Sequence, residues 1–222
     1  MTAVEEQNLA SCRLFHGIGP EDRRALCACL GGRRGEFHRG ERVWLTGDPV
    51  SGCGVVLRGG VRAETVSESG RRTVTAVHGP GSVFGDVLMA TPGGRSPVDL
   101  FASEEGTSVL FLPYLGIMDG CAQCCTRHAR LRENLLAEIS EKFWELRRKI
   151  GYLSVRSLRG RIALRLLDER ARTGRSTFSL GCSREDLADL LGVNRSALSR
   201  ELSHLRKEGV LDYHRNQFRI LK

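Results

Sequence analysis

The leucines in the last quarter of the chain recur with the period of a helix, in two separate stripes. The first stripe consists of Leu187, Leu190 and Leu191, and the second of Leu198, Leu202 and Leu205. The sequence Gly-Val-Asn at 192–194 interrupts the period between them. Two short helices joined by a glycine-bearing turn of about three residues are typical of a helix-turn-helix.

Polar residues mark where these helices begin and leave one face of the second helix open. Ser183 is the predicted N-cap of the first helix, with Asp186 three residues later as a short-chain form of a capping box. The second helix is predicted over about 195–208, and its leucines leave the polar N-terminal side chains to point outward. That layout is typical of a recognition helix in the major groove. The predicted DNA-binding residues are Asn194, Arg195, Ser196, Ser199 and Arg200, with Arg184 on the first helix and Arg215 beyond the second.

A short β-hairpin is predicted directly after the second helix. Two runs rich in apolar residues, 209–213 and 218–221, flank a polar connection of four residues, His214 to Gln217. A hairpin in this position is typical of the wing of a winged helix, with Arg215 near the phosphate backbone. The alternative, an ordinary pair of packed helices with a solvated polar face, leaves the hairpin unexplained.

The first half of the chain is predicted to be a short helix followed by a β-rich domain. Residues 20–30 form an amphipathic pattern with Pro20 at its start and acidic residues in the first turn. From Glu36 to about Pro113, short β-rich runs alternate with glycine-bearing turns, which favours an antiparallel sandwich or barrel. The runs are Val43–Leu45, Val55–Leu57, Val61–Val66, Thr73–Val77 and Ser108–Leu112.

A long helix is predicted from about Cys121 onward. Its apolar residues Leu136, Ile139, Phe143, Leu146, Ile150 and Leu153 are spaced 3, 4, 3, 4, 3, which is the a/d seam of a heptad pattern. Such a seam fits either a dimer or a helix buried against its own domain. Dimerisation is favoured, because a helix-turn-helix usually needs a partner to span two half-sites. We expect Ile139, Phe143, Leu146 and Ile150 to pack against their symmetry mates.

Composition indicates a globular chain with a basic C-terminal half. Of the 222 residues, 41% are hydrophobic and 27% are charged. No run approaches the roughly 18 apolar residues of a membrane helix, and the polar N-terminus is unlike a signal peptide, so we expect a cytoplasmic protein without membrane contacts. Residues 1–120 carry 12 Lys and Arg against 14 Asp and Glu, whereas residues 121–222 carry 22 against 12. This asymmetry predicts a polyanionic partner, and nucleic acid is the natural candidate.

The order of these parts resembles the Crp–Fnr superfamily of bacterial transcription regulators. The most specific segments are Gly-Pro-Gly-Ser-Val-Phe-Gly-Asp at 79–86, Arg-Gly-Arg-Ile-Ala at 159–163 and the stretch 192–202. Within the superfamily the chain looks most like a cysteine-containing group from anaerobic bacteria. Many relatives carry Glu where this chain has Ser196, so we expect a half-site that departs from the common one at that base pair.

The resemblance implies an α+β fold in three parts. These are a double-stranded, jelly-roll-like β-roll over 1–120, a dimerisation helix over 121–155 and a C-terminal winged helix-turn-helix over 156–222. It also implies a homodimer on a palindromic site in double-stranded DNA, with RNA polymerase as a further partner if the protein is an activator. A signal at the β-roll or the long helix then re-sets the spacing of the recognition helices.

The cyclic AMP pattern of the superfamily is only half matched. Members that bind cyclic AMP hold its ribose and phosphate with Gly-Glu and a later Arg-Ser, and its base with Thr and Ser on the long helix. Here the corresponding pairs are Gly-Asp at 85–86 and Arg-Ser at 95–96, with Pro97 following and Leu146 and Arg147 at the helix positions. The arginine can pair with a phosphate, but the aspartate is one methylene shorter than Glu and the base loses its partners. The predicted effector residues are Gly85, Asp86, Arg95 and Ser96, with cyclic AMP disfavoured.

Eight cysteines are many for a chain in a reducing compartment, where structural disulfides are rare. On a helix, Cys121, Cys124, Cys125 and His128 would share one face. Such a set can hold zinc, an iron–sulfur cluster or haem, with Cys29 or Cys12 completing it. Neighbouring thiols can instead form a reversible disulfide, as in a redox sensor. The third alternative is a buried structural role, because the stripe continues into Leu131 and Leu135.

A DNA-binding regulator accounts for most of these features. A ligand-binding regulatory subunit that acts on a protein partner is the alternative, but it would not need Arg195, Arg200 and a wing. An enzyme is not predicted, because the sequence has no nucleophile–base pair, P-loop or paired-carboxylate motif. The sequence therefore predicts a dimeric regulator whose DNA affinity is controlled by an effector where the β-roll meets the long helix, with a metal, cluster, haem or thiol favoured over a cyclic nucleotide.

Overall fold

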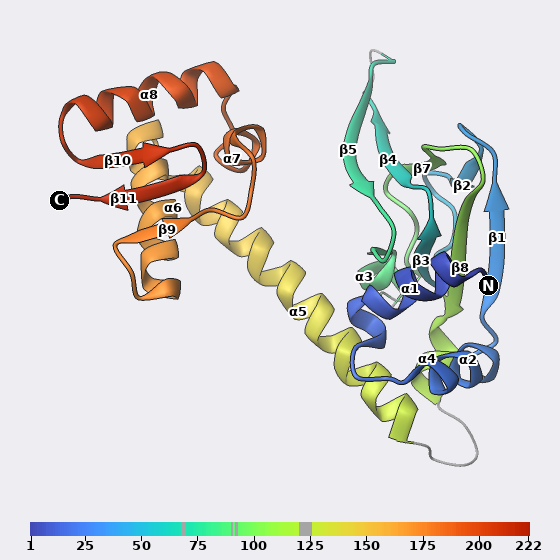
Figure 1. The fold of residues 1–222 in the computed structure, drawn as a ribbon. Helices are drawn as coiled ribbons and strands as arrows, with labels where there is room; N and C mark the ends of the chain where they lie inside the picture. Colours follow the sequence, from blue (N-terminus) through green and yellow to red (C-terminus); the bar gives the residue numbers. More distant parts are fainter. Residues whose placement is uncertain (68–69, 90, 92, 120–125) are drawn as a thin grey trace. The chain divides into compact units, whose positions relative to one another are not determined.

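The chain divides into two compact units, Met1–Glu141 and Lys142–Lys222, and the division falls within the long helix α5 (Thr126–Ser154). A computed structural model describes residues 1–67, 70–89, 91, 93–119 and 126–222 (Figure 1). Over these residues no helix is both long enough and apolar enough to cross a membrane. The predicted α+β fold class is confirmed, with a β-roll in the first unit and a winged helix-turn-helix in the second.

Two four-stranded antiparallel sheets form the β-roll. One has the strand order β1-β8-β3-β6 and the other β2-β7-β4-β5. Each of the five predicted runs overlaps one strand, and three further strands, β1, β6 and β7, complete the sheets. The strands are β1 (Arg33–Phe37), β2 (Arg42–Trp44), β3 (Gly52–Arg58), β4 (Val61–Val66), β5 (Arg72–His78), β6 (Val83–Phe84), β7 (Asp99–Ala102) and β8 (Thr107–Pro113).

Alternation along the strands gives the first unit two apolar cores. Val55 and Leu57 of β3 point to a core shared with the helices, whereas Val56 between them points to a core between the two sheets. The helices on this side are α1 (Ala3–Ser11), the 3₁₀ turn η1 (Arg13–Phe15), α2 (Pro20–Cys29), α4 (Tyr114–Asp119) and the first turns of α5. A short helix α3 (Asp86–Met89) follows β6. Helix α2 confirms the prediction over 20–30, with proline as its first residue.

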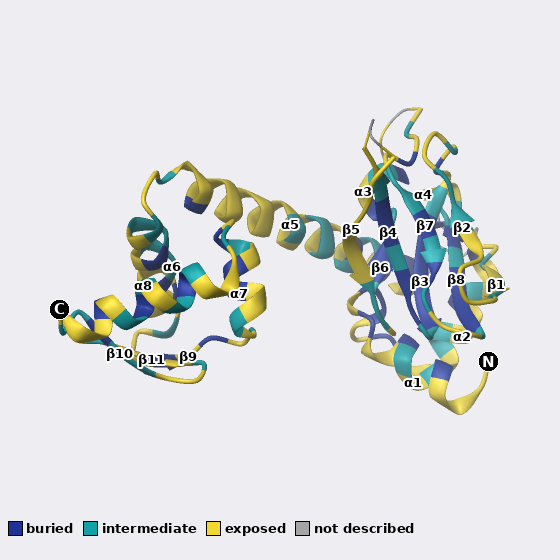
Figure 2. Cartoon of the chain, turned by 90° about the horizontal axis from the view of Figure 1, so that it is seen from above, coloured by how far each residue is buried: buried dark blue, intermediate teal, exposed yellow. Residues whose placement is uncertain are grey.

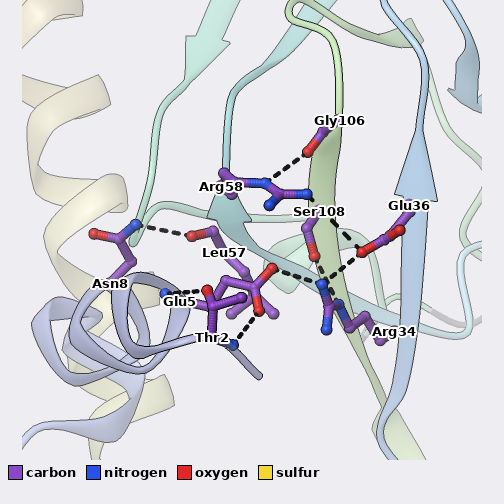
Figure 3. Close-up of polar contacts among 9 residues, drawn as sticks. All are labelled: Thr2, Glu5, Asn8, Arg34, Glu36, Leu57, Arg58, Gly106 and Ser108. Atoms are coloured by element: carbon purple, nitrogen blue, oxygen red, sulfur yellow. Dashed lines mark hydrogen bonds and ion pairs between the residues drawn. The ribbon is translucent and has the colours of Figure 1, made fainter.

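The sequence pattern did not predict helix α1, which is held to the β-roll by buried polar groups. The Glu5 side chain is fully buried, and one of its oxygens lies 2.7 Å from Arg34 of β1 (Figure 3). Arg34 also donates to the Ser108 hydroxyl at 3.0 Å and pairs with Glu36. Glu5 further accepts a hydrogen bond from the amide of Thr2, as part of a capping box. These contacts join three elements that are distant in sequence.

The second unit packs three helices against a three-stranded sheet of order β10-β11-β9. The connection between β10 and β11 differs from the prediction, because His214 and Gln217 pair across the ladder and only two residues form the turn. Strand β9, which was not predicted, pairs with β11 through Phe178 and Phe218. The elements are α6 (Leu158–Thr173), β9 (Thr177–Ser179), α7 (Arg184–Leu190), α8 (Arg195–Lys207), β10 (Leu211–His214) and β11 (Gln217–Ile220).

Candidate nucleic-acid interface and effector region

Side chains cap both helices of the predicted helix-turn-helix, α7 and α8. The Ser183 hydroxyl accepts from the Asp186 amide at 3.1 Å, and the Asp186 carboxylate accepts from the Ser183 amide at 2.8 Å, which confirms the predicted capping box. In the turn, Gly192 has a φ of +66°, a left-handed conformation that glycine adopts without strain. The glycine-bearing turn is therefore confirmed as well.

One side of α8 is buried in the second unit and the opposite side is open (Figure 2). The buried side carries Leu198, Leu202 and Leu205. Of the predicted DNA-binding residues, Arg195, Ser196 and Arg200 are exposed, and Ser199 is half-buried. Arg195 lies 3.9 Å from Glu185, an exposed pair that contributes little stability and leaves the guanidinium available. The first turns of α8 thus present two arginines and a serine on one open face.

The side chain of Asn194 caps the N-terminus of α8. Its Oδ1 accepts hydrogen bonds from the Ala197 amide at 2.8 Å and from the Ser196 hydroxyl at 2.7 Å, which makes it the N-cap of α8. An asparagine at this position satisfies an amide that would otherwise lack a partner. In this geometry its side chain orients the helix, and also restrains the Ser196 hydroxyl.

Arg184 lies against the wing. Its guanidinium carbon is 5.2 Å from the ring centres of both Tyr213 and Phe218, and its Nη2 donates to the Arg215 carbonyl at 2.6 Å. Burial lowers the pKa of Arg184 from its ordinary value. Arg215 is exposed at the hairpin turn with a φ of +53°, so its side chain projects from the wing while its carbonyl is fixed. Arg184 therefore packs against the wing, whereas the Arg215 side chain is exposed at the tip of the wing.

Arg161 connects the end of the long helix to the helix-turn-helix, a role that no sequence pattern identified. Its Nε donates to the Val155 carbonyl and its Nη1 to the Leu191 carbonyl, each at 2.8 Å. Next to it, a Cβ on Gly192 would lie 2.7 Å from Leu153 Cδ2, so a larger residue there would displace the Leu153 side chain. The Arg161 hydrogen bond and the Leu153 contact both reach the turn between α7 and α8. A movement at the end of α5 would therefore also displace this turn.

In the β-roll, an aromatic side chain lies beside two of the predicted effector residues. Gly85 has a φ of +74°, and a Cβ there would lie 2.6 Å from the Trp44 ring. Asp86 is buried at the start of α3. The indole therefore occupies space next to the Gly-Asp pair.

The side chains of the other two predicted effector residues already donate hydrogen bonds to backbone carbonyls. Arg95 donates to the Gly47 carbonyl at 2.6 Å and is otherwise exposed. Ser96 is buried, and its hydroxyl donates to the Val98 carbonyl at 2.6 Å. A phosphate bound here would have to displace these carbonyls from the arginine and the serine.

Comparison with known proteins places both units in one family. A Crp-like helix-turn-helix domain matches residues 160–222, and a cyclic nucleotide-binding domain matches residues 34–124. The chain is 27% identical to the cyclic AMP receptor protein of Thermus thermophilus over 89% of this chain and 87% of that protein. It is 27% identical to the transcriptional activator protein FnrA of Stutzerimonas stutzeri, over 82% of this chain and 74% of that protein.

The crystal structure of the Thermus thermophilus catabolite activator protein is similar at a TM-score of 0.55 and 26% identity, with 94% of this chain and 93% of that one covered. The chain belongs to the Crp–Fnr family. As a member of this family it is a DNA-binding transcription regulator and not an enzyme, because its relatives are transcription regulators. The β-roll is the family's cyclic nucleotide-binding-like domain.

The predicted dimer seam of this Crp–Fnr protein is an exposed apolar stripe on α5. Phe143, Leu146 and Ile150 are each more than half exposed, and Leu153 continues the stripe. Ile139 differs from the other three, because it packs against the helix-facing core of the first unit. Within one chain, three of the four predicted seam residues therefore lie open to solvent at heptad spacing.

The predicted metal or redox residues are only partly within the described structure. Cys121, Cys124 and Cys125 lie outside the described residues. His128 is buried at the start of α5, and its burial, together with the charges of Arg132 and Arg127, lowers the pKa of its imidazole. Cys12 is buried at the end of α1 and Cys29 is exposed at the end of α2. Where the chain is described, no group of three or more His, Cys, Asp or Glu residues is arranged to hold a metal ion.

Proposed function

We propose that this Crp–Fnr regulator reads its DNA site with the exposed N-terminal face of α8. The observation that supports this is the opposition of the buried leucines to Arg195, Ser196 and Arg200 on one short helix. Arg200 makes the dominant base contact, since arginine donates two parallel hydrogen bonds to guanine O6 and N7. Ser199 lies beside it. Asn194 and Arg184 act through the geometry of the helix and the wing, and Arg215 contacts a phosphate.

The test is a gel-shift titration of the full chain on DNA from upstream of its own gene and on random DNA. Arg200→Ala should cost roughly 1–3 kcal/mol on the specific site and much less on random DNA. Lys207→Ala is the matched control, because Lys207 is an exposed cation at the far end of the same helix. Equal losses on both DNAs for Arg200→Ala would show that Arg200 touches only phosphate.

We infer that the regulator binds as a homodimer through α5. The exposed stripe of Phe143, Leu146 and Ile150 has the spacing of a two-stranded coiled coil, and burying it against a second copy removes apolar surface from water. A two-fold dimer on a palindromic site places one recognition helix in each of two half-sites. A cytoplasmic location and a contact with RNA polymerase, if the protein activates, belong to the same proposal.

We propose that the effector acts at the junction between the β-roll and α5. His128 supports this, because its buried imidazole lies at the start of α5, three residues after Cys125 in the sequence, and imidazole is a common metal ligand. Arg127 pairs with Asp22 of α2 at 2.8 Å, and the Asn134 amide donates to the carbonyls of Leu14 and His16. A ligand or disulfide at Cys121, Cys124 or Cys125, with Cys12 or Cys29, would therefore act on a helix start that is tied to the N-terminal elements.

Cyclic AMP is a poor fit to the β-roll. The Trp44 indole lies against Gly85, and the Ser96 hydroxyl is already bonded within its loop. Leu146 and Arg147 stand where cyclic AMP-binding relatives have Thr and Ser. We therefore propose a metal, an iron–sulfur cluster, haem or thiol chemistry as the signal.

Anaerobic purification with a visible spectrum and metal analysis tests this part of the proposal. We expect a metal or cluster that is lost in the double variant Cys121→Ser and Cys125→Ser, together with a change in DNA affinity and an unchanged circular dichroism spectrum. Cys182→Ser is the control, because Cys182 packs against the core of the winged helix and belongs to the other unit of the chain. A colourless, metal-free protein whose DNA affinity is the same in oxidant and reductant would refute the proposal.

A further inference from the structure

An open cleft of about 710 Å³ lies at one end of the space between the two sheets of the β-roll. It is bounded by β1, β2, β8 and the segment before β3, and none of the four predicted effector residues lines it. Its volume is in the range of small-molecule sites in proteins. The cleft is thus a candidate site that the Gly-Asp and Arg-Ser pairs do not line, although its residue Trp44 lies against Gly85.

Three aromatic side chains form the apolar wall of the cleft. Phe37 and Phe111 have ring centres 6.2 Å apart at an interplanar angle of 76°, and Trp44 lies 6.0 Å from Phe111. All three are only half-buried, so part of each ring faces the cleft. Edge-to-face pairs of this kind hold rings in fixed orientations, and a planar apolar ligand can add a further ring contact.

Arg33 supplies the only cationic group among the described residues that line the cleft. It stands directly opposite Phe111 in the β1–β8 ladder, and directly opposite side chains share one face of a sheet. Over the described chain no residue forms an ion pair or side-chain hydrogen bond with Arg33, whereas its neighbour Arg34 contacts Glu5, Glu36 and Ser108. Among the residues that the structure describes, no carboxylate lines the cleft to neutralise the charge of Arg33.

We propose that this cleft binds a small planar aromatic carboxylate. The ring of the ligand packs against Phe37, Trp44 and Phe111, and its carboxylate accepts two hydrogen bonds from the Arg33 guanidinium. Arginine and a carboxylate match in geometry for such a paired contact, and the exposed aromatic surface supplies the apolar part. The site would accept a range of ring substituents, because one side of the cleft is open.

Trp44 makes the proposal directly measurable in the full chain. The protein has two tryptophans, so Trp144→Phe leaves Trp44 as the only one. We expect 4-methylbenzoate to change the Trp44 emission saturably at millimolar concentration, as the size of the molecule allows. Arg33→Gln should weaken binding roughly tenfold to a hundredfold, as loss of a charge-assisted hydrogen bond does. The neutral 4-methylbenzamide should bind weaker by a similar factor.

Two further variants distinguish the cleft from other sites. Arg42→Gln is the matched control, because Arg42 is an exposed arginine on the adjacent edge strand whose ladder partner Phe101 lies outside the inter-sheet core. It should bind 4-methylbenzoate like the parent. Phe37→Leu should weaken binding severalfold. The proposal is overturned if no saturable change occurs up to about 10 mM, if Arg33→Gln binds like the parent, or if the amide binds as well as the acid.

Discussion

Replacing Glu5 by Gln tests how much one buried ion pair contributes to the stability of the first unit. The side chain of Glu5 is fully buried, whereas Arg34 is 34% exposed and keeps a second carboxylate partner, Glu36 (Figure 3). Glutamine keeps the shape and can still accept from the Thr2 amide, 2.8 Å away in the native protein. It loses the negative charge that faces Arg34. Its NH2 group can also face the Arg34 guanidinium, so that two hydrogen-bond donors meet without an acceptor.

The expected cost follows from burial. Removing one partner of a fully buried pair costs about 3–5 kcal/mol, and a single hydrogen bond to a charged group contributes about 1.5–3 kcal/mol. Because Arg34 keeps Glu36 and some solvent, we expect Glu5→Gln to cost about 2–3 kcal/mol. Glu36 pairs with the same arginine but is 61% exposed, so Glu36→Gln should cost about 0–1 kcal/mol.

The same pair predicts how stability depends on pH. Burial alone would raise the pKa of Glu5, but the Thr2 amide and the Arg34 charge, with Ser108 and Arg58, outweigh it and lower the pKa below its ordinary value. A lowered folded-state pKa contributes stability above the unfolded-state pKa of about 4.3 and loses it as pH falls through the folded value. The difference between parent and Glu5→Gln should therefore be constant near neutral pH and shrink below about pH 4.

Urea unfolding of the Trp144→Phe protein provides the measurement, since Trp44 then reports on the first unit alone. With a slope of about 1–3 kcal/mol per molar urea, the expected loss shifts the midpoint by about 0.7–3 M. The reasoning is refuted if Glu36→Gln shifts the midpoint as much as Glu5→Gln. It is refuted equally if the Glu5→Gln difference grows on acidification.

Three further changes test the second unit. Leu146→Glu places like charges in the proposed apolar seam, so sedimentation should report a monomer with weak DNA binding. The control Leu167→Glu, at an exposed position of α6, should stay dimeric, and a dimeric Leu146→Glu protein would contradict the seam. Asn194→Ala removes the cap of α8 and should lower the unfolding free energy of this unit by about 0.5–2 kcal/mol in thermal denaturation, with Asn194→Asp close to the parent; unchanged stability would rule out the capping role. Arg161→Gln removes hydrogen bonds to two carbonyls, so DNA affinity should fall and hydrogen exchange in the turn after α7 should rise; unchanged exchange would show that Arg161 does not hold the turn.

Local patterns in the sequence determined the helix-turn-helix and most of the β-roll strands. The leucine period, the Ser183–Asp186 capping box and Gly192 each act within a few residues, so they carry their information in the chain itself. The α5 seam is similar, because heptad spacing specifies which side chains share a face. The sequence also specified the exposed face of α8, since the buried leucines leave one side for polar residues.

Contacts between distant residues decided the remainder. Helix α1 has a weak apolar pattern and is secured by the pairing of Glu5 with Arg34, 29 residues away. Strand β1 is polar along much of its length and exists because it pairs with β8, where Arg33 lies opposite Phe111. Such pairings depend on which strand the fold brings alongside, and no local period encodes that choice.

Contacts between distant residues also gave different roles to arginines that look equivalent in the sequence. By sequence, Arg184 and Arg215 are equivalent candidates for DNA contact, but the fold packs one against the rings of Tyr213 and Phe218 and leaves the other exposed on the wing. Arg33 and Arg34 are neighbours that alternate across β1, so one meets the buried Glu5 and the other the aromatic cleft. Residue type and spacing determined which groups were available, and burial and register in the tertiary structure decided what each of them contacts.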